Sequence, residues 1–163
     1  MRIISGKFKG KKIYLPNDKS TRPLKDLVKE SIFNVISHSN EIQIKINNSN
    51  ILDLFSGSGS FGLECISRGS QDVYFFENHG LAIKVLTKNV LSLNTTNNYK
   101  IFEKDCFDYF DSKNILNKRF DIIFIDPPYK ESKINKLIEN IIEKKVLNQK
   151  GIIIIHRHKK DKL

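Results

Sequence analysis

The chain has 163 residues, 39% of them hydrophobic, and a formal net charge of +10 at pH 7. This length predicts one domain, residues 1–163, with a sizeable core. The positive charge favours a polyanionic partner such as nucleic acid. No apolar run approaches the ~18 residues of a membrane span, and the N-terminus lacks the apolar core of a signal peptide. We therefore expect a cytoplasmic protein with no membrane partner.

The first 40 residues are basic and combine two predicted elements. Residues 2–6 and 11–15 are β-like and flank Gly10, which predicts a hairpin. Apolar and small residues at helical spacing then predict an amphipathic helix whose buried face is Leu24, Leu27, Val28, Ser31, Ile32, Val35 and Ile36.

From residue 50 to residue 163, strand-like and helix-like segments alternate. We expect strands near residues 51–55, 72–77, 100–105, 120–126 and 151–155, and helices near 60–68, 81–93 and 132–145. Strands that are apolar on both faces indicate a parallel sheet covered by helices. The predicted fold class is therefore α/β, a doubly wound, mostly parallel Rossmann-like sheet with helices on both faces.

A glycine-rich turn follows the first of these strands. Gly57, Gly59 and Gly62 fit the G-x-G-x-x-G pattern, in which the first glycine allows a tight turn, the second the close approach of a ligand, and the third close packing of the helix on the strand. Glu77 ends the next strand, where its carboxylate can accept from two ribose hydroxyls. This context fits either a dinucleotide or S-adenosylmethionine. Asp53, just before the turn, favours S-adenosylmethionine, because a carboxylate suits the ammonium group of its methionine moiety better than a pyrophosphate.

The third strand also ends in an acid. Asp105 can accept from adenine N6, with Cys106 and Phe107 as apolar neighbours of the ring. The alternative for Asp105 is a helix N-cap.

Asp126, Pro127, Pro128 and Tyr129 directly follow the apolar strand 121–125. The two prolines lack N–H groups and keep the segment extended, so that backbone carbonyls stay available as acceptors. Asp126 and the Pro127 carbonyl can grip an exocyclic amine while Tyr129 stacks on its ring. A proline-stopped turn is the alternative for an isolated Pro-Pro pair.

Basic side chains cluster on the predicted hairpin and just after it: Arg2, Lys7, Lys9, Lys11, Lys12 and Arg22. We expect them to contact RNA phosphates. The alternatives are a solvated charged surface, or basicity that reflects the codon bias of an AT-rich genome.

No metal is expected, since two cysteines and four histidines lack ligand spacing: Cys65, Cys106, His38, His79, His156 and His158. Both cysteines lie in apolar stretches and are expected to be buried free thiols.

The Asp-Pro-Pro-Tyr tetrapeptide resembles the signature of S-adenosylmethionine-dependent amino-methyltransferases. Residues 2–13, 21–34 and 62–69 resemble the RsmD family of 16S ribosomal RNA guanine-N2 methyltransferases. The resemblance implies methyl transfer from S-adenosylmethionine to one guanine N2 of 16S rRNA, in an assembled or assembling 30S subunit, by a monomer. Leu24 stands where the family has threonine. We also expect the C-terminal hairpin of the family to be missing after the strand at 151–155.

Three alternatives stay open. A DNA adenine or cytosine amino-methyltransferase shares the tetrapeptide but normally carries a target-recognition insertion. A non-catalytic RNA-binding module on the same fold would not need Asp126. A nicotinamide oxidoreductase would bind a dinucleotide at the glycine turn.

Overall fold

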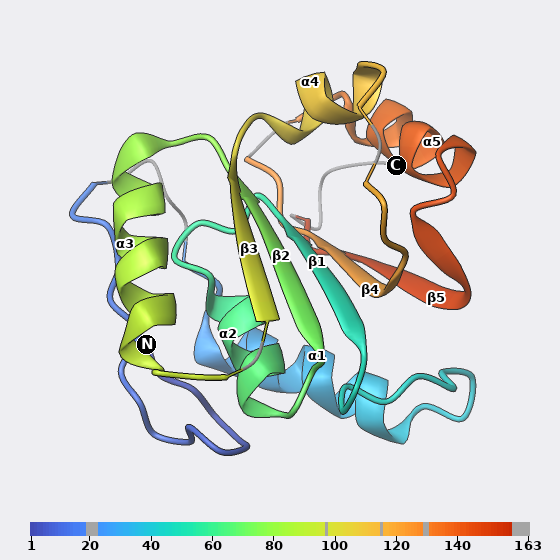
Figure 1. The fold of residues 1–163 in the computed structure, drawn as a ribbon. Coiled ribbons are helices and arrows are strands. Elements are labelled where there is room, and N and C mark those ends of the chain that lie inside the picture. Colours follow the sequence, from blue (N-terminus) through green and yellow to red (C-terminus); the bar gives the residue numbers. More distant parts are fainter. Residues whose placement is uncertain (19–22, 97, 115, 129–130, 158–163) are drawn as a thin grey trace.

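The computed structural model describes residues 1–18, 23–96, 98–114, 116–128 and 131–157 (Figure 1). Its centre is a five-stranded sheet in which every neighbouring pair is parallel, in the order β3-β2-β1-β4-β5. The strands are β1 (Asn50–Leu54), β2 (Asp72–Glu77), β3 (Asn98–Glu103), β4 (Phe120–Ile125) and β5 (Leu147–Ile155). The helices are α1 (Asp26–His38), α2 (Ser60–Ser67), α3 (Gly80–Ser92), α4 (Cys106–Asp111) and α5 (Ile134–Glu143).

Helices cover both faces of the sheet, because successive strand residues point to opposite sides. Ile51 of β1 belongs to a core cluster with residues of α1, α2 and α3. Leu52 and Leu54 belong to a second cluster with residues of α4 and α5. Figure 1 shows the same division, with α4 and α5 grouped away from α1 to α3. The predicted doubly wound Rossmann-like class is confirmed.

The predicted apolar face of α1 is confirmed in part, because Leu24 and Ile36 are buried and Val28 and Ile32 pack against the core. Leu27 and Val35 are exposed, whereas Lys29, Phe33 and Ile36 are buried. Lys29 can occupy a core-facing position because it has an ion-pair partner inside the protein, Glu64 of α2.

The N-terminal arm, defined here as residues 1–18, forms the predicted hairpin only as a short antiparallel contact. One β-bridge joins Arg2 with Lys12; beside it, the Ile3 N–H donates to the Lys11 carbonyl at 2.9 Å and the Ile13 N–H donates to the Met1 carbonyl at 3.0 Å. The arm also docks on the α2 side of the sheet, where Glu64 accepts from the backbone N–H groups of Ile4 at 2.8 Å and Ser5 at 2.9 Å. These hydrogen bonds hold the arm on helix α2.

Two smaller differences concern the middle of the chain. The third strand begins at Asn98 rather than near residue 100, and the short helix α4 was not predicted as an element. The second strand has its predicted bounds, Asp72–Glu77. Among the described residues, no helix has the length and apolar character to cross a membrane.

Candidate active site

The strand register brings three predicted carboxylates to one edge of the sheet. Leu54 of β1 lies opposite Phe76 of β2 on one side and Ile125 of β4 on the other. Glu77 is the last residue of β2 and Asp126 directly follows β4, so the two flank the start of the loop after β1. Asp53 lies one residue before Leu54 on the same strand. In parallel α/β sheets, ligands bind at these carboxyl ends.

The loop between β1 and α2 is held in an unusual backbone conformation. Phe55, Gly57 and Gly59 have φ values of 58°, 55° and 82°. A bulky residue such as Phe55 rarely adopts a positive φ, and such strain gathers at functional sites. The N–H of Ser56 donates to the Phe76 carbonyl at 2.9 Å, which fixes the loop against β2.

The structure gives a different reason why a glycine stands at position 59. A Cβ built on Gly59 would lie 2.4 Å from Cδ1 of Leu86 in α3, so the residue faces packed protein in addition to its positive φ. The sequence assigned this glycine to the approach of a ligand. Gly62 behaves as predicted: its Cβ would lie 2.2 Å from the Phe75 ring, so that only glycine lets α2 approach β2 so closely.

Glu77 is oriented by backbone amides of the same site. Its Oε2 accepts from the Gly57 N–H at 2.7 Å, and its Oε1 accepts from the N–H groups of Asn78 and His79, each at 2.9 Å. These bonds hold the carboxylate over the glycine turn. A carboxylate oxygen has more than one acceptor site, so the predicted contact with ribose hydroxyls is compatible with this arrangement.

Asp53 is almost completely buried, and its Oδ2 accepts from the Gly62 N–H at 3.0 Å. Burial raises the pKa of Asp53 well above its usual range, and the negative charges of Asp126 and Glu77 raise it further, against the lowering effect of the Gly62 N–H. Asp53 therefore lies within the electrostatic reach of both other carboxylates. Its hydrogen bond with Gly62 also ties the end of β1 to helix α2.

The chemistry of this acceptor set fits S-adenosylmethionine. Three carboxyl side chains lie at this edge, and two of them, Asp53 and Glu77, accept from backbone N–H groups. The cofactor brings two positive groups, a sulfonium and an ammonium. The residues that would hold it are Asp53, the turn at Gly57 and Gly59, and Glu77. A pyrophosphate would meet repulsion from the same carboxylates.

Asp105 takes the N-cap role that the sequence left as an alternative. Its Oδ1 accepts from the N–H groups of Phe107 at 2.8 Å and Asp108 at 3.2 Å, at the start of α4. Its Oδ2 accepts from Asn78 at 2.9 Å, which ties α4 to the end of β2. The Cys106 thiol is buried, and its pKa is raised mainly by burial and then by the charge of Asp105, so it packs as an apolar group.

Asp126 is half-buried at the end of β4, with Pro127 beside it. The sequence analysis missed its neighbour: His156, the residue after β5, has Nδ1 at 2.8 Å from Asp126 Oδ1. The predicted Tyr129 lies outside the described residues. Within those residues, no group of three or more His, Cys, Asp or Glu side chains is arranged to hold a metal ion.

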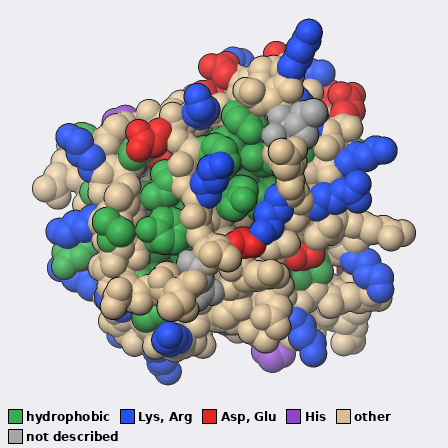
Figure 2. Space-filling view, viewed as in Figure 1, with side chains coloured by type: hydrophobic (Ala, Val, Ile, Leu, Met, Phe, Trp, Pro, Cys, Tyr) green, Lys and Arg blue, Asp and Glu red, His purple; other side chains and the backbone are tan. Residues whose placement is uncertain are grey.

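The basic residues of the arm differ in accessibility. Arg2, Lys7, Lys9 and Lys12 are exposed. Lys11 is half-buried, and its Nζ donates to the Ser92 carbonyl at the end of α3. This ammonium group therefore stabilises the C-terminal end of α3. Arg22 lies outside the described residues. Figure 2 shows further Lys and Arg side chains around an apolar area on the β3 side, so positive charge is not confined to the arm.

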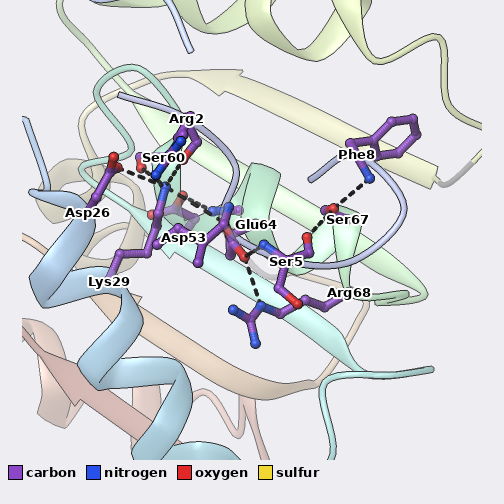
Figure 3. A network of polar contacts seen from close by, with 12 residues as sticks. Arg2, Ser5, Phe8, Asp26, Lys29, Asp53, Ser60, Glu64, Ser67 and Arg68 are labelled. Atoms are coloured by element: carbon purple, nitrogen blue, oxygen red, sulfur yellow. Dashed lines mark hydrogen bonds and ion pairs between the residues drawn. The ribbon is translucent and has the colours of Figure 1, made fainter. Parts of the chain in front are cut away.

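Polar contacts that the sequence analysis missed tie the arm to the glycine loop. Lys29 Nζ donates to the Arg2 carbonyl at 2.7 Å and to Ser60 Oγ at 3.1 Å, at the start of α2 (Figure 3). The buried side chain of Asn89 in α3 donates to the carbonyls of Tyr14 and Ser58, both at 2.9 Å. In the sequence, the only indication of these contacts was a lysine and an asparagine on otherwise apolar helix faces.

A parallel sheet, a glycine turn after β1 and acids at the ends of β2 and β4 are typical of class I S-adenosylmethionine-dependent methyltransferases, and similar proteins are named as methyltransferases. Comparison with known proteins narrows this class. A family model described as "Conserved hypothetical protein 95" matches residues 1–163. The chain belongs to this family, the RsmD family of methyltransferases.

The names of similar proteins agree with this family assignment. "Putative rRNA methyltransferase YlbH" of Bacillus subtilis is 36% identical over 154 residues, covering 94% of this chain and 80% of that protein. "Ribosomal RNA small subunit methyltransferase D" of Buchnera aphidicola subsp. Baizongia pistaciae is 34% identical over 157 residues, covering 96% and 76%. The solved structure "Putative methyltransferase yhhF from Escherichia coli" matches with a TM-score of 0.82 at 25% identity, covering 100% of this chain and 85% of that one.

Proposed function

We propose that this protein transfers a methyl group from S-adenosylmethionine to the exocyclic N2 amine of one guanine in 16S ribosomal RNA. The names of the relatives support ribosomal RNA of the small subunit as the substrate. The family resemblance supports guanine N2 and a cytoplasmic 30S particle, assembled or assembling, as the target of a monomeric enzyme.

The observation that carries the proposal is the position of Asp126. It follows β4 directly, next to the loop that joins β1 to α2, and its backbone N–H donates to the Leu54 carbonyl at 3.4 Å. An acceptor is thereby held at the strand edge that binds the cofactor. An exocyclic amine placed there would meet a carboxylate and the carbonyl of Pro127 on one side.

Bound S-adenosylmethionine supplies an electrophilic methyl group. The guanine N2 lone pair is delocalised into the ring, so the protein has to improve the nucleophile and align it. Asp126 and the Pro127 carbonyl accept from the N2–H bonds, which localises electron density on nitrogen. Tyr129 stacks on the base, a contact of about 1–3 kcal/mol. The base must leave its stack to reach this site, and alignment supplies much of the acceleration.

The arm is suited to dock the RNA. Exposed Arg2, Lys7, Lys9 and Lys12 offer phosphate contacts, and the arm is anchored to the α2 helix that follows the cofactor loop. The bound RNA and the bound cofactor would thus be held by one connected part of the fold.

The test is methylation of 30S particles that lack the mark, with nucleoside analysis and primer extension to map the product. N2-methylguanosine at one 16S position supports the proposal. Methylation of DNA in place of RNA would favour a DNA amino-methyltransferase, and RNA binding without transfer would favour a non-catalytic module.

A further inference from the structure

The contact between His156 and Asp126 is built by the sheet. Ile155 of β5 pairs with Ile125 of β4, so the next residue of each strand lies side by side. The His156 N–H donates to the Ile125 carbonyl at 2.9 Å, which continues the strand pairing by one residue. The two side chains are 18% and 16% exposed, and Nδ1 lies 2.8 Å from Oδ1. The backbone of His156 is therefore held by β4 at Ile125, and its side chain contacts Asp126.

The functional groups of the two side chains determine which of them donates the hydrogen bond. A carboxylate has only acceptors, so Nδ1 of His156 carries the hydrogen and donates it to Oδ1. Among the described residues, no other side-chain hydrogen bond to this carboxylate is made, which leaves Oδ2 for a ligand. Within the described ranges, His156 pairs with Asp126, and the adjacent Arg157 donates from Nη2 to the Glu131 carbonyl at 3.3 Å.

We propose that His156 is a positioning residue for methyl transfer: it fixes the Asp126 carboxylate through Oδ1 and so directs Oδ2 at the target amine. This inference rests on the proposed function of Asp126. Asp126 accepts the proton that N2 loses as the N2–methyl bond forms and the sulfur–methyl bond breaks, with the bonding pair staying on sulfur. An aspartate side chain that turned freely would present this acceptor in the wrong direction for part of the time.

Three substitutions of His156 separate the hydrogen bond from other roles. Asparagine places its Nδ2 donor near the position of Nδ1, whereas glutamine places its amide near the position of Nε2, and alanine has no donor. We expect His156→Ala and His156→Gln to lower kcat about 10- to 100-fold, as expected for a misaligned catalytic group. His156→Asn should recover most of the lost rate, and KM for S-adenosylmethionine should change little in all three.

The matched control is His38→Ala, which removes an exposed histidine at the end of α1 and should leave kcat unchanged. Unchanged kcat in His156→Ala would overturn the proposal. The proposal would also be overturned if His156→Asn were as slow as His156→Ala. Restoring a hydrogen-bond donor near Nδ1 would then not restore the rate.

A second measurement needs neither RNA nor cofactor. Nitrogen NMR of labelled protein should show His156 protonated at Nδ1, with slow exchange of that hydrogen, and Asp126→Ala should remove this signature. Its absence in the wild-type protein would overturn the His156–Asp126 pairing. Its presence in a protein that fails to methylate guanine N2 would leave the pairing in place and reject the proposed function alone.

Discussion

Replacement of Lys29 by methionine should destabilise the protein strongly. Lys29 and Glu64 are both fully buried, and Nζ lies 3.7 Å from Oε2. Burial lowers the pKa of Lys29, and Glu64 and Asp26 act against this shift. Methionine has a similar length without the charge, so the substitution leaves the Glu64 carboxylate buried without its ammonium partner.

The expected loss in the free energy of unfolding depends on the contacts that Glu64 keeps in the variant. Removal of one partner of a buried ion pair typically costs about 3–5 kcal/mol. Arg68 Nε still donates to Glu64 Oε1 at 2.9 Å, so we expect the lower end, about 3 kcal/mol. At roughly 2–4 °C per kcal/mol for a chain of this size, the melting temperature should fall by about 6–12 °C.

Chemical denaturation of a double-mutant cycle is the assay. Glu64→Gln alone should cost a similar amount, since it leaves Lys29 buried with the partly exposed Asp26 as its remaining ion-pair partner. The double variant should cost clearly less than the sum, because neither charge is then left unpaired. Lys136→Met is the control: its ion pair with Glu139 is exposed, and the change should stay within about 0.5 kcal/mol. A cost below about 1 kcal/mol for Lys29→Met would refute the reasoning.

Three further predictions concern the loop, the buried acid and the arm. Gly59→Ala should destabilise the fold by about 1–3 kcal/mol through its positive φ and the contact with α3, and an unchanged melting temperature would contradict this reason. The raised pKa of Asp53 gives stability that is present below its ordinary value of 3.8 and is lost as pH rises through the folded-state pKa. Asp53→Asn removes that loss, so its melting temperature relative to wild type should increase as pH rises from 4 towards 8, whereas a constant difference would refute the assignment. Neutralising Lys7, Lys9 and Lys12 together should flatten the slope of log RNA affinity against log salt by up to about 2 units, and an unchanged slope would make the arm a solvated surface.

The sequence predicted the sheet well because its strands are apolar on both faces and end at clear signals. Glycine and acid residues mark the ends of β1 and β2, and two prolines mark the end of β4. A signal that is local in the sequence was enough to place the edge where Asp53, Glu77 and Asp126 meet.

The parts that were missed depend on contacts between distant residues. Lys29 is buried because Glu64, 35 positions away in the sequence, lies opposite. The arm is held on α2 because its N–H groups donate to that same carboxylate. His156 lies beside Asp126 because β4 pairs with β5. Periodicity describes which face of an element is apolar, and it contains no information on such partners.

The most direct test of the account is methyl transfer by Asp126→Ala on 30S particles, measured beside calorimetric binding of S-adenosylmethionine. We predict that the wild-type protein forms N2-methylguanosine at one 16S position, and that the variant is at least about 100-fold slower, as expected for loss of a positioned proton acceptor. Its cofactor affinity should change little, because the glycine turn and Glu77 are intact. A variant that methylates guanine N2 at near the wild-type rate would contradict the central claim that Asp126 activates the amine.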